Sequence, residues 1–315
     1  MGTPQVVIPV LEALVATRHD VIGVVTQPDA KSGRGRVVAP SPLKEFAASN
    51  GLKVLQPASL RSKKFLAEIR GLAPELITVA AYGKILPEAV LALPRLGSIN
   101  VHPSLLPKYR GASPVAASLS NGDNITGVSI MLMDKGMDTG PLLAQQQEII
   151  LPDDDTGRLT NRLFRRGAQL LVMTLERWVN RTVTPVPQDH SRATVSAVLV
   201  KTDGLLDFSR TAEQLVNQIR AFRPWPGAYT TWEGRRLKIL EALSLFPNTE
   251  ISEENPGTVI SVREDATVSA AIVTSNGLLG LRRIQLEGKR PTDCGEFLRG
   301  YPEFVGAHLP NVESS

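Results

Sequence analysis

Apolar residues in the first half of the chain follow two spacings, one typical of buried strands and one typical of amphipathic helices. The runs that are apolar nearly throughout predict strands at residues 21–27, 75–83 and 98–102. Apolar residues three or four apart predict helices at residues 5–16, 41–50 and 60–71. Strands that alternate with helices favour a parallel sheet covered on both faces.

A second pair of strands is predicted at residues 124–133 and 142–150, joined by a loop that contains glycines. A long helix should follow. Asp155 or Thr156 can cap its first turn, and leucines at amphipathic spacing continue as far as Trp178.

The helical pattern breaks after that tryptophan. Residues 182–198 contain two prolines and predict an extended linker. We therefore expect a first, catalytic domain over residues 1–183, a linker over residues 184–199 and a C-terminal domain over residues 200–315.

The C-terminal part begins with a predicted helix at residues 212–222, and short strands separated by turn residues follow it. Their spacing is typical of a small β-barrel. Trp225, which stands between two prolines, is expected to anchor the core. Together the patterns predict an α/β protein, with a Rossmann-like, mostly parallel sheet followed by a small, OB-like β-barrel domain.

The beginning of the chain lacks an expected element. Gly2, Thr3 and Pro4 read as a turn into the first helix, so a strand should precede them, and Met1 is all that does. We expect that the first strand is missing because the start lies too far downstream. The alternative is a protein that lacks this strand altogether.

Composition narrows the functional classes. Hydrophobic residues make up 42% and charged residues 21% of the chain, and Cys294 is the single cysteine, which excludes an internal disulfide framework. No Cys and His cluster has metal-ligand spacing, and no apolar run reaches the roughly 18 residues that span a membrane. We expect a cytosolic protein that needs no metal and binds no membrane. The net charge is +4, and the basic excess lies within the first 185 residues.

Three polar residues are candidates for chemistry. Asn100 and His102 lie two apart at the end of a predicted buried strand, so their side chains point to the same side. Asp138 lies in a glycine-flanked loop that could reach the same place. Ligand sites in open α/β sheets form at the carboxyl ends of the strands. Each residue alone is more typical of a structural role, and their combination favours a site.

These residues belong to two longer motifs, GSINVHPSLLPKYRGASP (97–114) and MDKGMDTGP (133–141). Both resemble the folate-dependent formyltransferases, in which Asn-x-His-Pro-Ser-Leu-Leu-Pro and a later Asp-x-Gly-x-Asp-x-Gly hold the catalytic triad. The resemblance implies that Asn100, His102 and Asp138 are catalytic and that 10-formyltetrahydrofolate is the co-substrate. AAYGKILP (80–87) is similar to the segment that faces the pteridine ring. The folate contacts implied are Ala81, Tyr82, Gly83, Ile85, Ser104, Leu105, Leu106 and Pro107.

Two further segments resemble the branch of this family that acts on initiator methionyl-tRNA. Residues 201–230 are similar to the start of the second domain in that branch, and residues 27–47 to its basic insertion loop. The resemblance implies that Lys31, Arg34 and Arg36 contact the tRNA, and that the protein is a monomer of the bacterial cytoplasm or of an organelle of bacterial origin. Guanidinium groups on a flexible loop suit phosphates.

Other functions stay open at this point. The chain could formylate a nucleotide-linked amino sugar or glycinamide ribonucleotide, or hydrolyse formyl-folate with the same triad. It could also be a non-catalytic RNA-binding module. A dinucleotide-dependent oxidoreductase is disfavoured, since no Gly-x-Gly-x-x-Gly opens the first helix.

Overall fold

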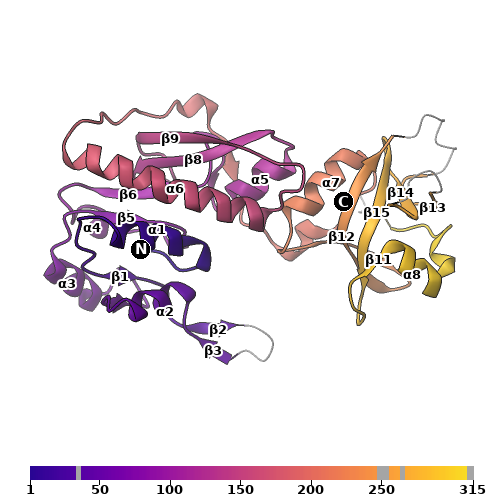
Figure 1. The fold of residues 1–315 in the computed structure, drawn as a ribbon, viewed down its shortest axis with the longest axis horizontal. Coiled ribbons are helices and arrows are strands. Elements are labelled where there is room, and N and C mark those ends of the chain that lie inside the picture. Colours follow the sequence, from indigo (N-terminus) through magenta and orange to yellow (C-terminus); the bar gives the residue numbers. More distant parts are fainter. Residues whose placement is uncertain (33–36, 247–254, 263–266, 311–315) are drawn as a thin grey trace. The chain divides into compact units, whose positions relative to one another are not determined.

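The computed structural model describes residues 1–32, 37–246, 255–262 and 267–310 (Figure 1). The chain divides into two compact units. The first unit comprises residues 1–114, 125–149 and 159–197, and the second comprises residues 115–124, 150–158 and 198–315. The prediction of a 1–183 domain, a 184–199 linker and a 200–315 domain stays a prediction.

The first unit contains most of the predicted helices and strands of the N-terminal half. Its helices are α1 (Ile8–Val15), α2 (Pro42–Ser49), α3 (Lys63–Leu72), α4 (Glu88–Leu91) and most of α6 (Thr156–Val179). Its strands are β1 (Val24–Val25), β2 (Ala30–Ser32), β3 (Val37–Ala39), β4 (Val54–Leu55), β5 (Ile77–Val79), β6 (Ser98–His102), β7 (Arg110–Gly111), β8 (Ile125–Leu132), β9 (Leu142–Ile149) and β10 (Val195–Ser196).

Local sequence explains where several helices begin. Ser41 accepts a hydrogen bond from the backbone N–H of Lys44, and Ser62 accepts one from that of Phe65. Each hydroxyl therefore satisfies a donor that the first helical turn leaves without an intrahelical partner.

The strands of the first unit are parallel where a helix connects them. β1 pairs with β4 and β5 pairs with β6 in parallel, as the sequence predicted. β6 pairs with β8 and β8 with β9 in antiparallel fashion, giving the order β5-β6-β8-β9. The β8–β9 connection is too short for the crossover that a parallel pair needs, so these two strands form a hairpin.

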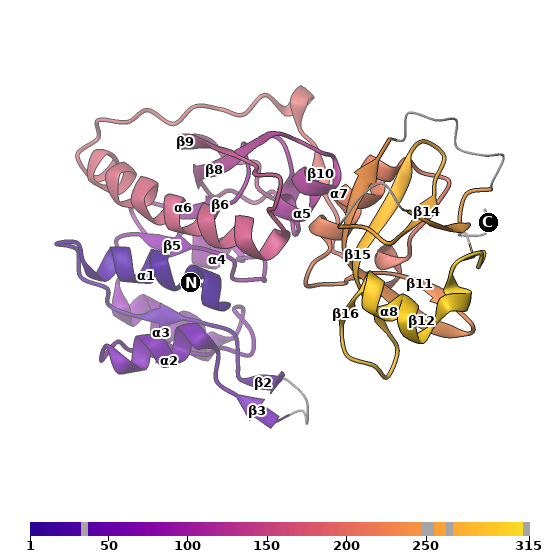
Figure 2. The same ribbon diagram turned by 45° about the vertical axis from the view of Figure 1, so that its right-hand side comes forward.

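Apolar side chains cover both faces of these strands. Ile99 and Val101 of β6 pack in one cluster with α1 and α6, whereas Ile77 and Val79 of β5 pack in another with α3 and α4. Figures 1 and 2 show α6 running across β6 and β8. Gly167 permits this approach, because a Cβ there would stand 2.7 Å from Cγ1 of Val101. The sheet thus lies between helices, as expected for an α/β domain.

The first two residues of the chain lie between β1 and β5. The amino group of Met1 donates to the carbonyl of Thr78 (2.6 Å), and the amide of Ala80 donates to the carbonyl of Met1 (2.9 Å). On the other side, the amide of Gly2 donates to the carbonyl of Val25 (3.0 Å). Met1 and Gly2 therefore make strand-like contacts with both neighbours.

The basic segment at residues 27–47 is partly regular. β2 and β3 pair in antiparallel fashion, with Lys31 opposite Val38, and α2 follows them. Lys31 lies in β2, but its side chain is outside the described part of the structure. Arg34 and Arg36 lie outside the described residues altogether.

The second unit is an antiparallel half-barrel accompanied by helices. Its strands follow the order β11-β12-β15-β14-β13, with β16 beside β15. The elements are α7 (Ala212–Ala221), α8 (Cys294–Gly300), β11 (Ala228–Trp232), β12 (Arg235–Leu245), β13 (Val259–Ser261), β14 (Ala270–Val273), β15 (Leu278–Leu286) and β16 (Thr292–Asp293). α5 (Pro114–Ser120) belongs to it except for its first residue. The predicted strands of this half are therefore confirmed.

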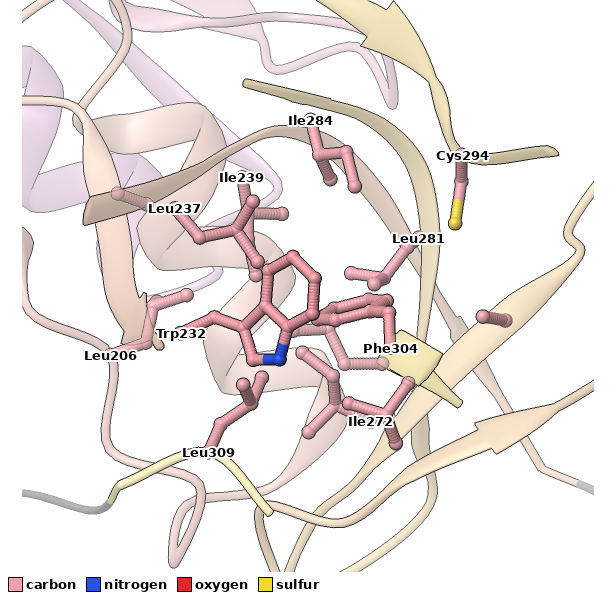
Figure 3. Close-up of a cluster of buried hydrophobic side chains, with 14 of the residues drawn as sticks. Leu206, Trp232, Leu237, Ile239, Ile272, Leu281, Ile284, Cys294, Phe304 and Leu309 are labelled. Atoms are coloured by element: carbon pink, nitrogen blue, oxygen red, sulfur yellow. The ribbon is translucent and has the colours of Figure 1, made fainter. Parts of the chain in front are cut away.

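The curled sheet encloses an aromatic core around Trp232 (Figure 3). The indole lies 5.1 Å from the ring of Phe304 and 5.7 Å from that of Phe297, both edge to face. Trp225, expected in the core, is instead 50% exposed, whereas Trp232 is 5% exposed. Trp232 takes the core because β11 turns alternate residues inward, and Trp225 lies in the loop before that strand.

No helix within the described ranges is both long and apolar enough to cross a membrane.

Trp232→Ala should lower the free energy of unfolding by about 3–5 kcal/mol, because it leaves a large void in a packed core. Trp225→Ala is the matched control and should change it by less than about 0.5 kcal/mol, since the side chain is half exposed. Denaturant titration followed by circular dichroism measures both. Equal losses would contradict this account of the core.

Candidate active site

β6 presents two polar side chains on one face of the sheet. Asn100 and His102 alternate with Ile99 and Val101, which pack against the α1 and α6 side. The two polar residues therefore face the opposite side. His102 is 4% exposed, and Asn100 is partly buried. Polar groups at this depth need hydrogen-bond partners.

The loop between β8 and β9 supplies the third residue. Asp134 accepts hydrogen bonds from the amide of Gly136 (3.0 Å) and the hydroxyl of Thr139 (2.6 Å), which closes a tight turn. Asp138 takes a left-handed conformation with φ 55°, which aspartate tolerates better than most residues. Gly140 cannot be replaced without a shift, since a Cβ there would stand 1.9 Å from the carbonyl oxygen of Leu132.

The structure brings Asn100, His102 and Asp138 together. The amide Nδ2 of Asn100 donates to Oδ1 of Asp138 over 3.3 Å, and Nδ1 of His102 lies 3.6 Å from Oδ2. The Asp138 side chain is 15% exposed. The arrangement that the motifs predicted is therefore present as geometry, with the amide and the imidazole on either side of one carboxylate.

His102 is fixed by its second ring nitrogen. Nε2 lies 2.9 Å from the carbonyl oxygen of Tyr109. A carbonyl oxygen accepts and cannot donate, so Nε2 carries a proton and donates it. Nδ1 is then the nitrogen that faces the carboxylate, and it carries a hydrogen only when the ring is doubly protonated.

Two backbone features at β7 complete the surroundings of Asp138. The amide of Gly111 donates to Oδ2 over 2.9 Å, with Gly111 at φ 97°. A Cβ at this glycine would stand 2.6 Å from the carbonyl oxygen of Ser196, which belongs to β10, the strand paired with β7. The residues that follow α6 therefore lie along the first unit and hold this part of the site.

Sequence reasoning missed Gln188, which lies in the segment after α6 and anchors the Asp138 loop. Its Nε2 donates to the carbonyl oxygens of Asp138 (2.9 Å) and Gly140 (2.7 Å), and its Oε1 accepts from Nη2 of Arg110 (2.7 Å). Gln188 is 5% and Arg110 7% exposed. A glutamine between prolines and charged residues gives no periodic signal, so this role could not be read from the sequence.

The residues expected to contact folate differ in how far their side chains are exposed to solvent. Ala81 and Gly83 are exposed, and Ile85 is 85% exposed, which is unusual for a large apolar side chain. Tyr82 is buried, and burial raises the pKa of its phenol.

In the second motif, Leu105 and Pro107 are partly buried and Leu106 is buried. Ser104 is fully buried and donates to the carbonyl of Lys108 (2.6 Å), so its hydroxyl is already used within the protein.

Two family models match the chain. The model of formyl transferases matches residues 1–175, and the model of the formyl transferase C-terminal domain matches residues 199–302.

The chain belongs to the formyl transferase family.

Curated relatives match it over its whole length. A methionyl-tRNA formyltransferase from Roseiflexus sp. (strain RS-1) is 46% identical over 315 residues, which cover 100% of this chain and 95% of the relative. One from Thermus thermophilus is 46% identical over 311 residues, covering 99% of this chain and 98% of the relative.

Solved structures share the fold at lower identity. WlaRD, a sugar 3N-formyl transferase, superposes with a TM-score of 0.63 at 19% identity, covering 92% of this chain and 97% of that one. HypX from Aquifex aeolicus in complex with tetrahydrofolic acid gives a TM-score of 0.55 at 16% identity, covering 82% of this chain and 44% of that one.

Gln188→Leu should lower the free energy of unfolding by about 2–3 kcal/mol, because it keeps the volume but leaves two buried carbonyls and a buried guanidinium without this partner. Gln147→Leu, at an exposed position on β9, is the control. Urea titration measures both, and a Gln188 variant as stable as the control would show that the anchor contributes nothing.

Proposed function

We propose that this protein transfers the formyl group of 10-formyltetrahydrofolate to the α-amino group of initiator methionyl-tRNA. The observation that carries the proposal is the meeting of an amide, an imidazole and a backbone N–H around the Asp138 carboxylate. The match to methionyl-tRNA formyltransferases supports the choice of acceptor, because it continues through the second unit at 40–46% identity.

Formyl transfer to an amine requires a neutral nucleophile, donors for the oxyanion and a proton for the departing folate nitrogen. An α-amino group has a pKa of about 8, so a sizeable fraction is neutral near pH 7. The reaction therefore needs positioned hydrogen-bonding groups rather than a covalent intermediate.

Asn100 suits the stabilisation of the oxyanion. A side-chain amide has two N–H donors, and the bond to Asp138 uses one of them. The same bond orients the amide, so the other donor is held in place before the substrate arrives. One donor of this kind is typically worth about 3–4 kcal/mol in the transition state.

His102 and Asp138 suit the proton transfers. A proton taken from the attacking amine by Nδ1 would produce a positive ring held between the Tyr109 carbonyl and Asp138, whereas a proton taken by the carboxylate would leave both side chains neutral. Both of these oxygens favour the charged ring. The same pair can return the proton to the folate nitrogen, so the two residues would act as one acid–base unit.

The folate and tRNA contacts are part of the same proposal. The exposed Ile85 side chain would become buried against the bound folate. The backbone at Ala81 and Gly83 would face the pteridine ring of the folate. Lys31, Arg34 and Arg36, which stand in or between β2 and β3 in the sequence, would bind tRNA phosphates. We also propose that the half-barrel is of the OB type and that the protein works as a cytoplasmic monomer.

Asn100→Ala and Asp138→Asn should each lower kcat by at least about a hundredfold, because each removes a group that meets the transition state. Turnover is measured with 10-formyltetrahydrofolate and methionyl-initiator tRNA. Asn50→Ala and Asp153→Asn, at exposed positions, are the matched controls and should keep the parent rate. Near-parent rates in both site variants would contradict the proposed mechanism.

The same assay decides between acceptors. Formylation of initiator tRNA in preference to elongator tRNA supports the proposal, while formate release without tRNA would indicate a hydrolase. An amino-sugar nucleotide serves as a third substrate, because WlaRD shares the fold.

Arg34→Ala should raise the KM for tRNA several-fold and make it less dependent on salt, because the variant neutralises fewer phosphates and so releases fewer counterions on binding. The KM for the folate should not change. Arg18→Ala, at an exposed arginine paired with Glu176, is the control for the loss of one positive charge. An unchanged KM for tRNA would show that the basic segment at residues 27–47 does not bind tRNA and has another function.

A further inference from the structure

The β2–β3 hairpin is a two-stranded element without a supporting third strand. Each strand has three residues, and within the described residues neither strand pairs with any other. Figures 1 and 2 show the pair extending away from α2. An isolated hairpin of this size is at best marginally stable in water. Its direction therefore depends on what holds the two ends of the segment that contains it.

Two side chains hold Asp29, the residue that immediately precedes β2. Oδ2 of Asp29 accepts a hydrogen bond from Nζ of Lys44 (2.6 Å), and Oδ1 accepts one from Nε2 of Gln56 (2.7 Å). Nε2 of Gln56 also donates to the carbonyl of Gln27 (3.0 Å), so both of its N–H donors are used. The side chains of Asp29 and Lys44 are each 30% exposed. We call Asp29, Lys44 and Gln56 the hairpin clamp.

The other end of the segment is fixed at the start of α2. The hydroxyl groups of Thr26 and Ser41 lie 2.9 Å apart and share a hydrogen bond, and Thr26 is fully buried directly after β1. Ser41 also accepts from the backbone amide of Lys44 (3.2 Å). Lys44 is thus held at its backbone by Ser41 and at its ammonium group by Asp29. The clamp therefore joins the residue before the hairpin to the helix after it.

The clamp contains an ion pair at neutral pH. The hydrogen bond from Lys44, followed by the one from Gln56, holds the pKa of the Asp29 carboxyl below its ordinary value. Ion pairs at a protein surface contribute little to global stability. The consequence to look for is therefore the direction of the hairpin and not the free energy of unfolding.

A small change at the base of the hairpin becomes larger at its far end. β2 is about 10 Å long at roughly 3.4 Å per residue, so a tilt of about 20° moves its end by about 3 Å. Hydrogen bonds from basic side chains to phosphate oxygens are made at about 2.7–3.2 Å. A tilt of this size is therefore enough to separate a basic side chain from a phosphate.

We propose that Asp29, Lys44 and Gln56 are positioning residues for the tRNA. The clamp holds the hairpin in the direction in which the basic residues of the segment at 27–47 meet tRNA phosphates. The inference rests on the proposed function, which assigns those basic residues to tRNA. It adds that an acidic residue strengthens the binding of a polyanion, because Asp29 acts through the hairpin and not through its own charge.

The sign of the effect separates this proposal from simple electrostatics. Asp29→Asn removes a negative charge, which by itself should tighten the binding of tRNA. The same change replaces one carboxylate oxygen with an NH2 group, which then faces a donor of Lys44 or of Gln56. The clamp therefore predicts weaker binding, with the Kd for initiator tRNA raised about three- to tenfold, as for the loss of one coupled pair.

The experiment measures the Kd for initiator tRNA by filter binding, together with steady-state formylation. Asp29→Asn and Gln56→Leu should each raise the Kd and the KM for tRNA, and should leave kcat and the KM for 10-formyltetrahydrofolate unchanged. Asp153→Asn is the matched control, because it breaks an exposed ion pair with Arg158 (2.8 Å) in the second unit. This control should not raise the Kd.

A double variant tests whether the ion pair acts as one unit. Lys44→Gln should also raise the Kd, and adding Asp29→Asn to it should weaken binding no further, since the two residues share one network. The proposal is overturned if Asp29→Asn leaves the Kd unchanged or lowers it. It is also overturned if the KM for the folate rises in parallel, or if the two single effects multiply in the double variant.

Failure of the proposed function gives a different result. A parent protein that binds initiator tRNA without formylating it contradicts the proposed function, while the Kd values still decide whether the clamp positions the hairpin. A parent protein that binds no tRNA overturns both.

Discussion

The candidate site depends on hydrogen bonds to one partly buried carboxylate, that of Asp138. Asp138 accepts from the Asn100 amide and from the Gly111 backbone and lies beside His102, so groups from both β6 and β7 converge on its two oxygen atoms. A carboxylate removed from water is costly unless hydrogen bonds replace its hydration. Glycine is required at positions 111 and 140, because a Cβ there would stand too close to the carbonyl oxygen of Ser196 or of Leu132.

The same constraint explains why the site's support lies far away in the sequence. Gln188 and Ser196 come after α6, yet they hold the Asp138 loop and the β7 backbone through buried contacts. The Tyr109 carbonyl sets which nitrogen of His102 is protonated. The chemistry of the imidazole is therefore decided by a backbone group with no sequence signature.

The first unit contains a space of about 560 Å³ between β1 and β5, lined in part by Val10 and Leu11 of α1. Within the described residues, no strand pairs with the edges of β1 and β5 that border this space. Backbone groups at such edges depend on water or on the chain's first residues for hydrogen bonds. Strand β6, which holds Asn100 and His102, lies next to β5, so the pairing of this sheet also determines how firmly the two side chains are held.

The sequence by itself determined the helices and strands, because apolar periodicity reports which face of each element is buried, and it identified Asn100, His102 and Asp138 through their motifs. It misplaced Trp225 and missed Gln188, because a loop residue has no period from which burial can be inferred. Only the tertiary structure decided the protonated nitrogen of His102, the second donor to Asp138 and the space between β1 and β5 beside Met1. These depend on distances between segments that lie far apart in the sequence, and no local pattern encodes such distances.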